Sequence, residues 1–398
     1  MANNNNKDKC NVPHLRFPEF SGEWKKSSIR EQFELYSGNT PSRMNKNQFD
    51  GSINWITSGE LKEHYISDTK EKISEEAAKN NSLKLLPVGT FVIAIYGLEA
   101  NGVRGTCSIT TRESTISQAC MAFTSKMDIQ NEFLYSWYKK HGNIIGIKYA
   151  QGTKQQNLSY DIIERFNISY PCMEEQKKLI RFISLIDQRI ATQNKIIEDL
   201  KKLKSAIIYR CYSSRTNMVS LYDLLKQCSE RNRSGLDLQV LSVSNKYGFI
   251  AQSDQFEDRE VASDDTSNYK VVEKGMFAYN PARINVGSIA LYEKDGKGIV
   301  SPMYVCFTTE QLLLPGYLKH YFASQTFRQE MYKRLEGSVR LCLTFEGLCN
   351  IEISLPSIER QENISKYLST IENKVSLEEC VLSQYQQQRS YLLSQMFI

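Results

Sequence analysis

An internal duplication is the feature that most constrains what this chain can fold into. When the 398-residue sequence is shifted by 185 residues, its middle aligns with its end without a gap. Gly152 then aligns with Gly337, and Pro171 aligns with Pro356. A unit of this length far exceeds the roughly 20 to 50 residues of solenoid repeats, so each copy should be a whole domain with an attached element. The further aligned pairs are Leu158 and Leu343, Ile168 and Ile353, Ser169 and Ser354, Glu174 and Glu359, Gln176 and Gln361, and Ile186 and Ile371.

Each copy changes its pattern once along the chain. Its first part is rich in Val, Ile, Tyr, Phe and Thr with Gly and Asn between them, which is typical of strands. Helical stretches at 132–142 and 316–335 interrupt these strands. We therefore expect mixed α/β or α+β globular domains. The expected strands include residues 91–97, 165–171, 287–293 and 350–356.

A long helix should end each copy. After Pro171 and again after Pro356 the chain contains no helix breaker for about 40 residues. At a rise of 1.5 Å per residue, such a segment forms a helix of about 60 Å. The expected organisation is a globular domain at 1–171, of which 1–12 form a disordered tail, a long helix at 172–213, a second globular domain at 214–356 and a second long helix at 357–398.

Both predicted helices carry apolar residues at alternating spacings of four and three. This heptad spacing is typical of a coiled-coil seam. Each helix could instead flank its own domain, but a stripe this long and narrow favours a long partner, and the other copy is the obvious one. The seam positions are Leu179, Ile183, Ile186, Ile190, Gln193, Ile197, Leu200, Lys204 and Ile207 in the first helix and Ile364, Leu368, Ile371, Val375, Glu378, Leu382, Tyr385, Arg389 and Leu392 in the second.

Polar residues interrupt the two seams at equivalent positions. Gln193 matches Glu378, and Lys204 matches Arg389. A two-fold relation between the copies requires the helices to run antiparallel, which predicts that Gln193 lies beside Glu378. Polar residues in a seam fix its register at a cost in stability, so this layer is a candidate register pin.

Composition narrows the class of protein. With 24% charged and 41% hydrophobic residues, the chain should be a soluble globular protein, and it contains no apolar run or signal peptide that would take it out of the cytoplasm. Its ten cysteines form no CxxC pair, which favours reduced structural thiols over disulfides or a zinc site. The net charge is +7 over residues 1–213 and −2 over 214–398, so a dense phosphate-facing patch is expected in the first half.

No sequence motif indicates catalysis. The chain contains no Walker A loop, no HExxH, no GxSxG and no GxGxxG after a strand. The four histidines are scattered without ligand spacing, which favours surface or hydrogen-bonded roles over metal binding. The run from Asn280 to Arg283 faintly resembles the Asn-Pro-Pro-aromatic signature of amino-group methyltransferases, but it lacks the second proline and the aromatic residue. We therefore expect no catalytic residues and no bound metal.

Eight stretches carry a family resemblance. They are SGNTPSR (37–43), NWITSGEL (54–61), 72–97, TISQACMAF (115–123) and 168–187 in the first copy, and VLSVSNKYGFI (240–250), 268–291 and 353–372 in the second. In this order, duplicated and followed by long helices, they resemble the DNA-specificity (S) subunit of Type I restriction–modification systems over nearly the whole chain. One position departs from the duplication, because Glu175 in the segment 168–187 aligns with Arg360 in the segment 353–372. Equivalent contacts with partner subunits at these two positions therefore do not follow.

The resemblance implies a function. It implies two target-recognition domains that each read half of a bipartite DNA sequence, separated by two long helices that pair as an antiparallel coiled coil and set the spacing. A rod of about 60 Å corresponds to roughly one and a half to two turns of B-DNA. The resemblance also implies a non-catalytic subunit that binds two modification (methyltransferase) subunits and further restriction subunits. S-adenosylmethionine, Mg and ATP are then expected on those partners, and none on this chain.

Candidate DNA contacts follow from the side chains that read base edges, chiefly Arg, Lys, Asn and Gln. The run 152–157 offers a glycine turn followed by such residues, and an ordinary solvated turn would have the same composition. The loops 96–104 and 279–285 are also candidates, although Tyr96 and Tyr279 themselves favour the core. The candidate residues are Arg43, Arg104, Lys154, Gln155, Gln156, Asn157, Asn280, Arg283, Asn285 and Arg340.

Two other functions stay open at this point. A self-contained methyltransferase or endonuclease is disfavoured, because recognition-like domains and helices already fill both copies. A coiled-coil scaffold that does not read DNA would be favoured by absent or salt-insensitive DNA binding.

Overall fold

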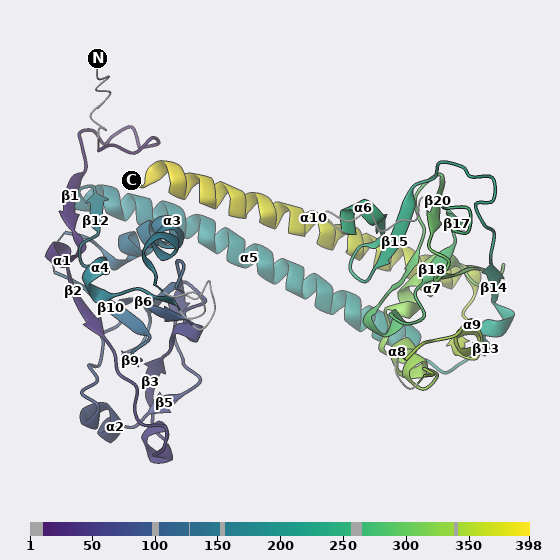
Figure 1. Cartoon of the computed structure of the whole chain (residues 1–398), viewed down its shortest axis with the longest axis horizontal. Helices are drawn as coiled ribbons and strands as arrows, with labels where there is room; N and C mark the ends of the chain where they lie inside the picture. The colour runs from purple at the N-terminus through teal and green to yellow at the C-terminus, as the bar shows by residue number, and fades with distance from the viewer. Residues whose placement is uncertain (1–10, 98–102, 127, 152–155, 256–264, 338–340) are drawn as a thin grey trace. The chain divides into compact units, whose positions relative to one another are not determined.

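The computed structural model describes residues 11–97, 103–126, 128–151, 156–255, 265–337 and 341–398 (Figure 1). The chain divides into two compact units. Unit 1 contains Met1–Gln193 and Val381–Ile398, and unit 2 contains Asn194–Cys380. No helix in the described part of the chain is long and apolar enough to span a membrane.

Unit 1 is built around a five-stranded sheet with the order β2-β10-β6-β8-β4. Helix α3 (Asn131–Tyr149) packs on β6, β8 and β10 and closes the core with Phe133 and Tyr138. A second sheet has the order β5-β3-β9, and β3 runs parallel to β9. The strands are β2 (Phe33–Ser37), β3 (Ile53–Ile56), β4 (Tyr65–Ile66), β5 (Lys72–Ile73), β6 (Phe91–Ala94), β8 (Cys107–Thr110), β9 (Ser114–Ile116) and β10 (Cys120–Ser125).

Shorter elements complete unit 1. Two further strand pairs form, β1 with β12 and β7 with β11. Residues 1–10 of the expected tail at 1–12 lie outside the described residues, but Asn11 is held in the fold, because it accepts a hydrogen bond from Ser169 and donates one to the Trp24 carbonyl. The remaining elements are β1 (Lys25–Ser28), β7 (Tyr96–Gly97), β11 (Gln156–Asn157), β12 (Asn167–Tyr170), α1 (Ile29–Gln32), α2 (Glu75–Asn80) and α4 (Tyr160–Ile163), with 3-10 turns at Lys46–Phe49 and Ser58–Glu60.

Unit 2 contains two four-stranded sheets, with the orders β14-β21-β18-β19 and β16-β15-β20-β17, and a small β13-β22 pair. The strands are β13 (Met218–Ser220), β14 (Leu225–Cys228), β15 (Val240–Ser244), β16 (Gly248–Ala251), β17 (Lys270–Glu273), β18 (Phe277–Tyr279), β19 (Ile289–Leu291), β20 (Lys297–Val300), β21 (Val305–Thr309) and β22 (Glu352–Ser354).

The helical stretch expected at 316–335 is two helices. Helix α7 (Pro315–Phe322) ends before Ser324, and α8 (Gln325–Tyr332) begins after it. The Ser324 hydroxyl accepts a hydrogen bond from the Phe327 N–H at 3.0 Å, which caps the second helix. The other short elements of unit 2 are α6 (Gln252–Gln255), α9 (Phe345–Cys349) and 3-10 turns at Leu221–Asp223 and Ile284–Val286.

The duplication extends to strand register. In unit 1, Phe91 of β6 lies opposite Phe123 of β10, and in unit 2 Phe277 of β18 lies opposite Phe307 of β21. Their ring centroids are 5.3 Å and 5.1 Å apart, respectively. The parallel pair β3 and β9 has its equivalent in the parallel pair β15 and β20. Each copy therefore builds the same core from the same alternating aromatic residues.

Two long helices, α5 (Met173–Tyr212) and α10 (Ile358–Met396), begin and end within two residues of the predicted segments. Within unit 1, Arg389 of α10 pairs with Asp187 of α5, with 2.5 Å between Nε and Oδ1. Within unit 2, Lys204 of α5 pairs with Glu372 of α10 at 2.7 Å. The two ion pairs are equivalent under the 185-residue shift, so each unit joins α5 to α10 through the same pair of aligned positions.

All predicted seam positions are buried or half-buried. A heptad stripe that faces a partner helix accounts for this pattern. Gln193 and Glu378 belong to different units, so their proposed layer stays a prediction.

The C-terminal end of each long helix completes a core that belongs mainly to the other copy. The Phe397 ring, just beyond α10, lies 5.1 Å from Phe133 in unit 1. The Tyr212 ring, at the end of α5, lies 4.8 Å from Tyr317 in unit 2. Tyr212 and Phe397 are aligned by the duplication. The units therefore divide inside the helices and not at the ends of the sequence repeats.

A buried glutamine anchors the start of each long helix. The Gln361 side chain accepts a hydrogen bond from Leu314 N–H at 2.9 Å and donates to the carbonyls of Leu312 and Pro356. Gln176 makes the same three kinds of bond in unit 1. The aligned glutamines thus have one structural task in both copies, which is to tie the first helical turn to the loop before α3 or α7.

Candidate nucleic-acid interface

The described ends of two candidate segments of unit 1 pair with each other. Strand β11, which ends the run 152–157, pairs with β7, which opens the loop 96–104. Gln156 lies opposite Gly97, and Asn157 lies opposite Tyr96. The Leu158 N–H also donates to the Ile95 carbonyl at 2.8 Å. Strand pairing therefore brings together two segments that the sequence had marked separately.

The same meeting of loops occurs in unit 2. The Leu343 N–H donates to the Pro281 carbonyl at 3.1 Å, and the Tyr279 hydroxyl donates to the Leu343 carbonyl at 3.2 Å. Tyr279 is fully buried, and Tyr96 is half-buried. Tyr279 therefore holds the base of its loop against Leu343, whereas residues 98–102 of the unit 1 loop lie outside the described residues.

Some predicted contacts fall outside the described residues. Lys154, Gln155 and Arg340 are among them, and Gln156 is described only by its strand pairing. Asn157 is exposed at the end of β11.

Arg43 is held by its own unit. Its guanidinium forms a two-pronged ion pair with Glu71, and the second contact measures 2.9 Å. The same group lies 4.8 Å from the Phe49 ring centroid and 5.5 Å from that of Trp55. The hydrogen bond that Arg43 donates to the Glu71 carboxylate raises the pKa of Arg43, so the side chain is a fixed cation. Because 60% of the side chain is exposed, Arg43 can meet a phosphate only in competition with Glu71.

Arg104 is fixed against helix α3. A Cβ atom at Gly146 of α3 would lie 2.8 Å from the Arg104 Cγ, and one at Gly142 would lie 2.6 Å from Gly105. Only glycine allows so close an approach. The two glycines therefore hold the end of the loop 96–104, and its half-buried cation, at a defined place on α3.

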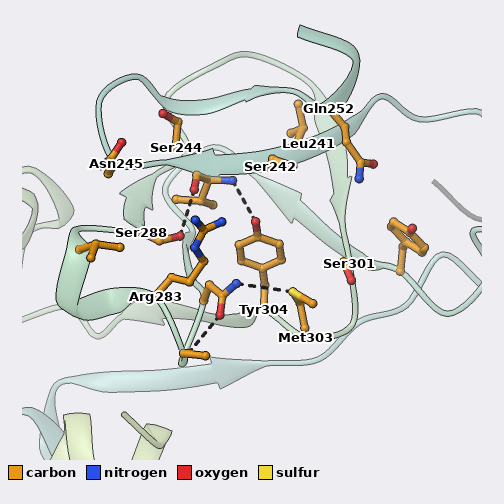
Figure 2. A pocket seen from close by; sticks show the side chains of 15 residues that line it. Leu241, Ser242, Ser244, Asn245, Gln252, Arg283, Ser288, Ser301, Met303 and Tyr304 are labelled. Carbon is orange, nitrogen blue, oxygen red and sulfur yellow. Dashed lines mark hydrogen bonds between the residues drawn. The ribbon is translucent and has the colours of Figure 1, made fainter. Parts of the chain in front are cut away.

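A cleft in unit 2 has a volume of about 570 Å³ (Figure 2). Strand β15, the turn after β18 and the turn after β20 form its walls. Two predicted residues, Asn280 and Arg283, line it, whereas Asn285 does not. The other polar lining residues were not predicted from the sequence; they are Ser242, Ser244, Asn245, Gln252, Tyr269, Ser288, Ser301 and Tyr304.

Internal hydrogen bonds hold the cleft wall. The Ser288 hydroxyl donates to the Val243 carbonyl at 3.0 Å, and the Tyr304 hydroxyl accepts from the Val243 N–H at 3.3 Å. The Asn280 carbonyl oxygen of the side chain accepts from Ala282 N–H, which closes a tight turn. These bonds link three segments, so the cleft is preformed.

Arg283 brings a positive charge into this cleft. Figure 2 shows its side chain beside Tyr304 and Ser288. The turn that carries it closes at Gly287, whose φ of 93° favours glycine, and the Ser288 N–H donates back to the Arg283 carbonyl. An arginine among hydroxyl and amide groups is the side-chain set that reads base edges and phosphates.

A second hollow in unit 2, of about 590 Å³, involves the β15–β16 hairpin and both long helices. Lysines contribute strongly to its lining, but three of them are ion-paired. Lys201 contacts Glu379, Lys204 contacts Glu372, and Lys319 contacts Glu293. This pairing weakens the positive field that a polyanion would meet. The cleft around Arg283 is therefore the better candidate for base recognition.

The missed cleft residues had a weak sequence signal. In VLSVS, Ser242 and Ser244 alternate with apolar residues, which places both on one face of a strand. Ser301 lies about 60 residues further on and reaches the cleft only because β20 pairs in parallel with β15. The spacing of residues along the sequence does not indicate that β15 pairs with β20.

Most of the chain matches the family model described as "Type I restriction modification DNA specificity domain", at residues 21–202 and 231–384. The chain belongs to this family. Each of the two matched stretches of the specificity-domain family falls within one copy of the duplication. Among the described residues of this family member, no group of three or more His, Cys, Asp or Glu side chains could hold a metal ion.

Curated relatives of this specificity-domain chain carry consistent names. The Type I restriction enzyme MjaIX specificity subunit of Methanocaldococcus jannaschii is 29% identical over 46% of this chain and 42% of the relative. The EcoR124I/EcoR124II specificity subunit of Escherichia coli is 27% identical over 47% of this chain and 46% of the relative. The chain thus spans about half the length of these two relatives. The MjaVIII specificity subunit of M. jannaschii is 21% identical over 91% of this chain and 88% of the relative.

Solved structures share the fold of this specificity-domain chain. The S subunit of a Type I restriction–modification system from M. genitalium has a TM-score of 0.62 at 15% identity and covers 97% of this chain and 99% of its own. A chain from a study of "complex assembly" in "the type I R-M system" has a TM-score of 0.58 at 14% identity, with coverage of 97% and 99%. At these identities the likeness concerns the fold alone.

Proposed function

We propose that this chain is the DNA sequence-specificity subunit of a Type I restriction–modification complex. Each unit reads one half of a bipartite DNA target. The paired helices set the spacing between the halves and dock the methyltransferase and restriction subunits.

One observation carries the proposal. In both units the N–H of an aligned leucine, Leu158 or Leu343, donates to a carbonyl just after the equivalent inner strand, Ile95 after β6 or Pro281 after β18. Two equivalent polar loop pairs, each on its own rigid core, are what two half-site readers require. Family membership supports the same assignment.

The chain itself carries no catalysis in this proposal. Double-stranded DNA, two modification subunits and restriction subunits are its partners in the cytoplasm. The modification subunits use S-adenosylmethionine, and Mg and ATP bind to partner subunits and not to this chain.

Adenine methylation across the genome tests the proposal. Cells that express the chain with its cognate methyltransferase are compared with cells that express the methyltransferase alone. We expect a bipartite methylated sequence with a fixed gap only when the chain is present. An intact, co-purifying complex without added methylation would contradict the proposal, and methylation by this chain alone would favour a self-contained enzyme. Absent or salt-insensitive DNA binding by the complex would favour a scaffold.

A further inference from the structure

Gln252 occupies a defined place in the cleft of unit 2. It is the first residue of α6 and follows β16 directly. Strand β16 is antiparallel to β15, with Ala251 opposite Leu241, and this pairing sets Gln252 beside the cleft floor. Figure 2 shows the Gln252 side chain among those that line the cleft.

The Gln252 amide has an unused acceptor. Its Oε1 atom is buried and has no hydrogen-bond partner among the described residues. Neighbouring polar groups are engaged, since Ser288 and Tyr304 bond to Val243 and Asn280 bonds to Ala282. A buried acceptor without a donor costs free energy, which a ligand that brings an N–H or O–H into the cleft would recover.

The surroundings favour a nucleic acid as that ligand. Arg283, which offers only donors, lies in the same cleft and favours a partner that is anionic or rich in acceptors. If the chain is a DNA-specificity subunit, as proposed above, the available donors are the amino groups on the edges of the bases. In the major groove these are N6 of adenine and N4 of cytosine.

Adenine fits the Gln252 amide better than cytosine does. The amide pairs a carbonyl acceptor with an NH₂ donor, and adenine presents N6–H₂ beside the acceptor N7. Cytosine offers the amino group without that neighbouring acceptor. We propose that Gln252 is a specificity-determining residue that reads an adenine in the half-site bound by unit 2. This assignment rests on the proposed function of the chain.

Methylation mapping with cleft variants tests the proposal. The parent complex first defines the bipartite sequence. Gln252→Ala should then relax one adenine position in one half of that sequence, with the other half and the gap unchanged. Gln252→Glu, which keeps only acceptors, should shift that position toward cytosine. The matched control is Gln227→Ala, because Gln227 is exposed on β14 and does not line the cleft.

Binding to altered duplexes provides a second measurement with the unmodified protein. In the parent complex, replacing one adenine of that half-site by 7-deazaadenine, which lacks N7, or by purine, which lacks the amino group, should weaken binding roughly 5- to 150-fold. The Gln252→Ala complex should lose this sensitivity at the same position.

The two failures are distinguishable. If the parent chain directs no bipartite methylation, the proposed function itself is contradicted. A parent sequence that is unchanged in every assembled Gln252 variant would overturn the adenine assignment and leave the function intact. A uniform loss over all sequences, with no position-specific relaxation, would also overturn it, because that result describes a structural or phosphate-binding residue. If Gln252→Ala does not assemble, the deaza and purine duplexes decide with the parent, and equal binding to all of them rejects the proposal.

Discussion

At the scale of residues, two aligned glutamines make the same main-chain hydrogen bonds in the two copies. Gln176 and Gln361 are both fully buried, and each satisfies one N–H and two carbonyl groups of the main chain. Their neighbours differ, since Glu175 is buried in an ion pair with Arg16 whereas Arg360 is exposed. The glutamines that close the fold are therefore the same in both copies, whereas the residues beside them differ.

Gln361→Ala should destabilise unit 2 by about 2–4 kcal/mol, because one N–H and two carbonyls lose their partner and a cavity remains. Urea unfolding, with hydrogen exchange to locate the loss, measures the effect. Gln388→Ala, at an exposed position of α10, is the control and should change stability by less than about 0.5 kcal/mol. Equal effects of the two substitutions would refute the anchoring role of Gln361.

Arg283→Ala should weaken DNA binding by the complex. A contact to a base would cost roughly 1–3 kcal/mol and relax one position of the target, whereas a contact to phosphate would weaken all sequences alike and reduce the salt dependence of binding. Competition binding at two salt concentrations distinguishes these results. Unchanged binding and methylation would remove Arg283 from the interface. Lys154→Ala, in the first copy, is expected to behave in the same way.

At the scale of elements, each helix pair is tied to its globular core through a histidine. His64 is stacked between Tyr65 and Tyr135, with ring centroids 4.1 Å and 3.8 Å away, and its Nδ1 lies 3.7 Å from Asp187 of α5. In unit 2, His320 of α7 lies 3.6 Å from Glu372 of α10. The two histidines do not align under the duplication. The carboxylates that they contact, Asp187 and Glu372, do align.

Stability should fall in acid partly through unit 2. Burial lowers the pKa of His320 below the ordinary 6.5. Burial would raise the pKa of Glu372, but the hydrogen bond from Lys204 together with the charges of Lys204, His320 and Lys319 outweighs it, so this pKa also lies below its usual value. Both groups bind fewer protons when folded, so the free energy of unfolding should decrease as the pH falls below about 6.5 and further through the ordinary glutamate range near 4.3.

Thermal unfolding between pH 5 and 8 measures this dependence. His320→Gln should flatten the decrease between about pH 6.5 and 5, because the titrating imidazole is gone. His14→Gln, at an exposed histidine, serves as the control and should keep the slope of the parent. Identical slopes in all three proteins would contradict the assignment.

The far end of α10 should contribute strongly to unit 1. Phe397 is fully buried against Phe133, so Phe397→Ala should cost about 3–5 kcal/mol in the free energy of unfolding. Hydrogen exchange should show the loss in α3 and β6, far away in the sequence. Tyr391→Ala, at a position that is 61% exposed, should leave exchange there unchanged. A loss confined to the end of α10 would show that Phe397 does not support the core.

At the scale of the whole molecule, exchange of the first recognition domain should alter only one half of the target. Residues 1–165 are replaced by the corresponding segment of another family member, and methylated sites are mapped. We expect a new half-site, with the other half and the gap retained, because strand pairing keeps each pair of candidate loops on its own core. A change in both halves would mean that the two readers are not independent.

The sequence predicted the periodic features of this molecule and missed those that depend on pairing in space. The duplication and the heptad stripe indicated two equivalent copies and two helices, because both are patterns along the chain. The break at Ser324 was missed, since one capping hydroxyl outweighs a continuous helical pattern. The cleft residues Ser242 and Ser301 meet only through the β15–β20 pairing, and Gln252 carried no pattern at all.

The order of synthesis follows from the way the helix ends close the cores. Unit 2 is continuous in sequence, so a ribosome delivers all of it in one run. Unit 1 needs residues 381–398, which emerge after the entire second unit has been made. The nascent first half must therefore wait with its core unsealed until Phe397 arrives, although domains made first usually fold first. A chain truncated by a premature stop codon would therefore have an open core in unit 1, where cellular proteases could cleave it.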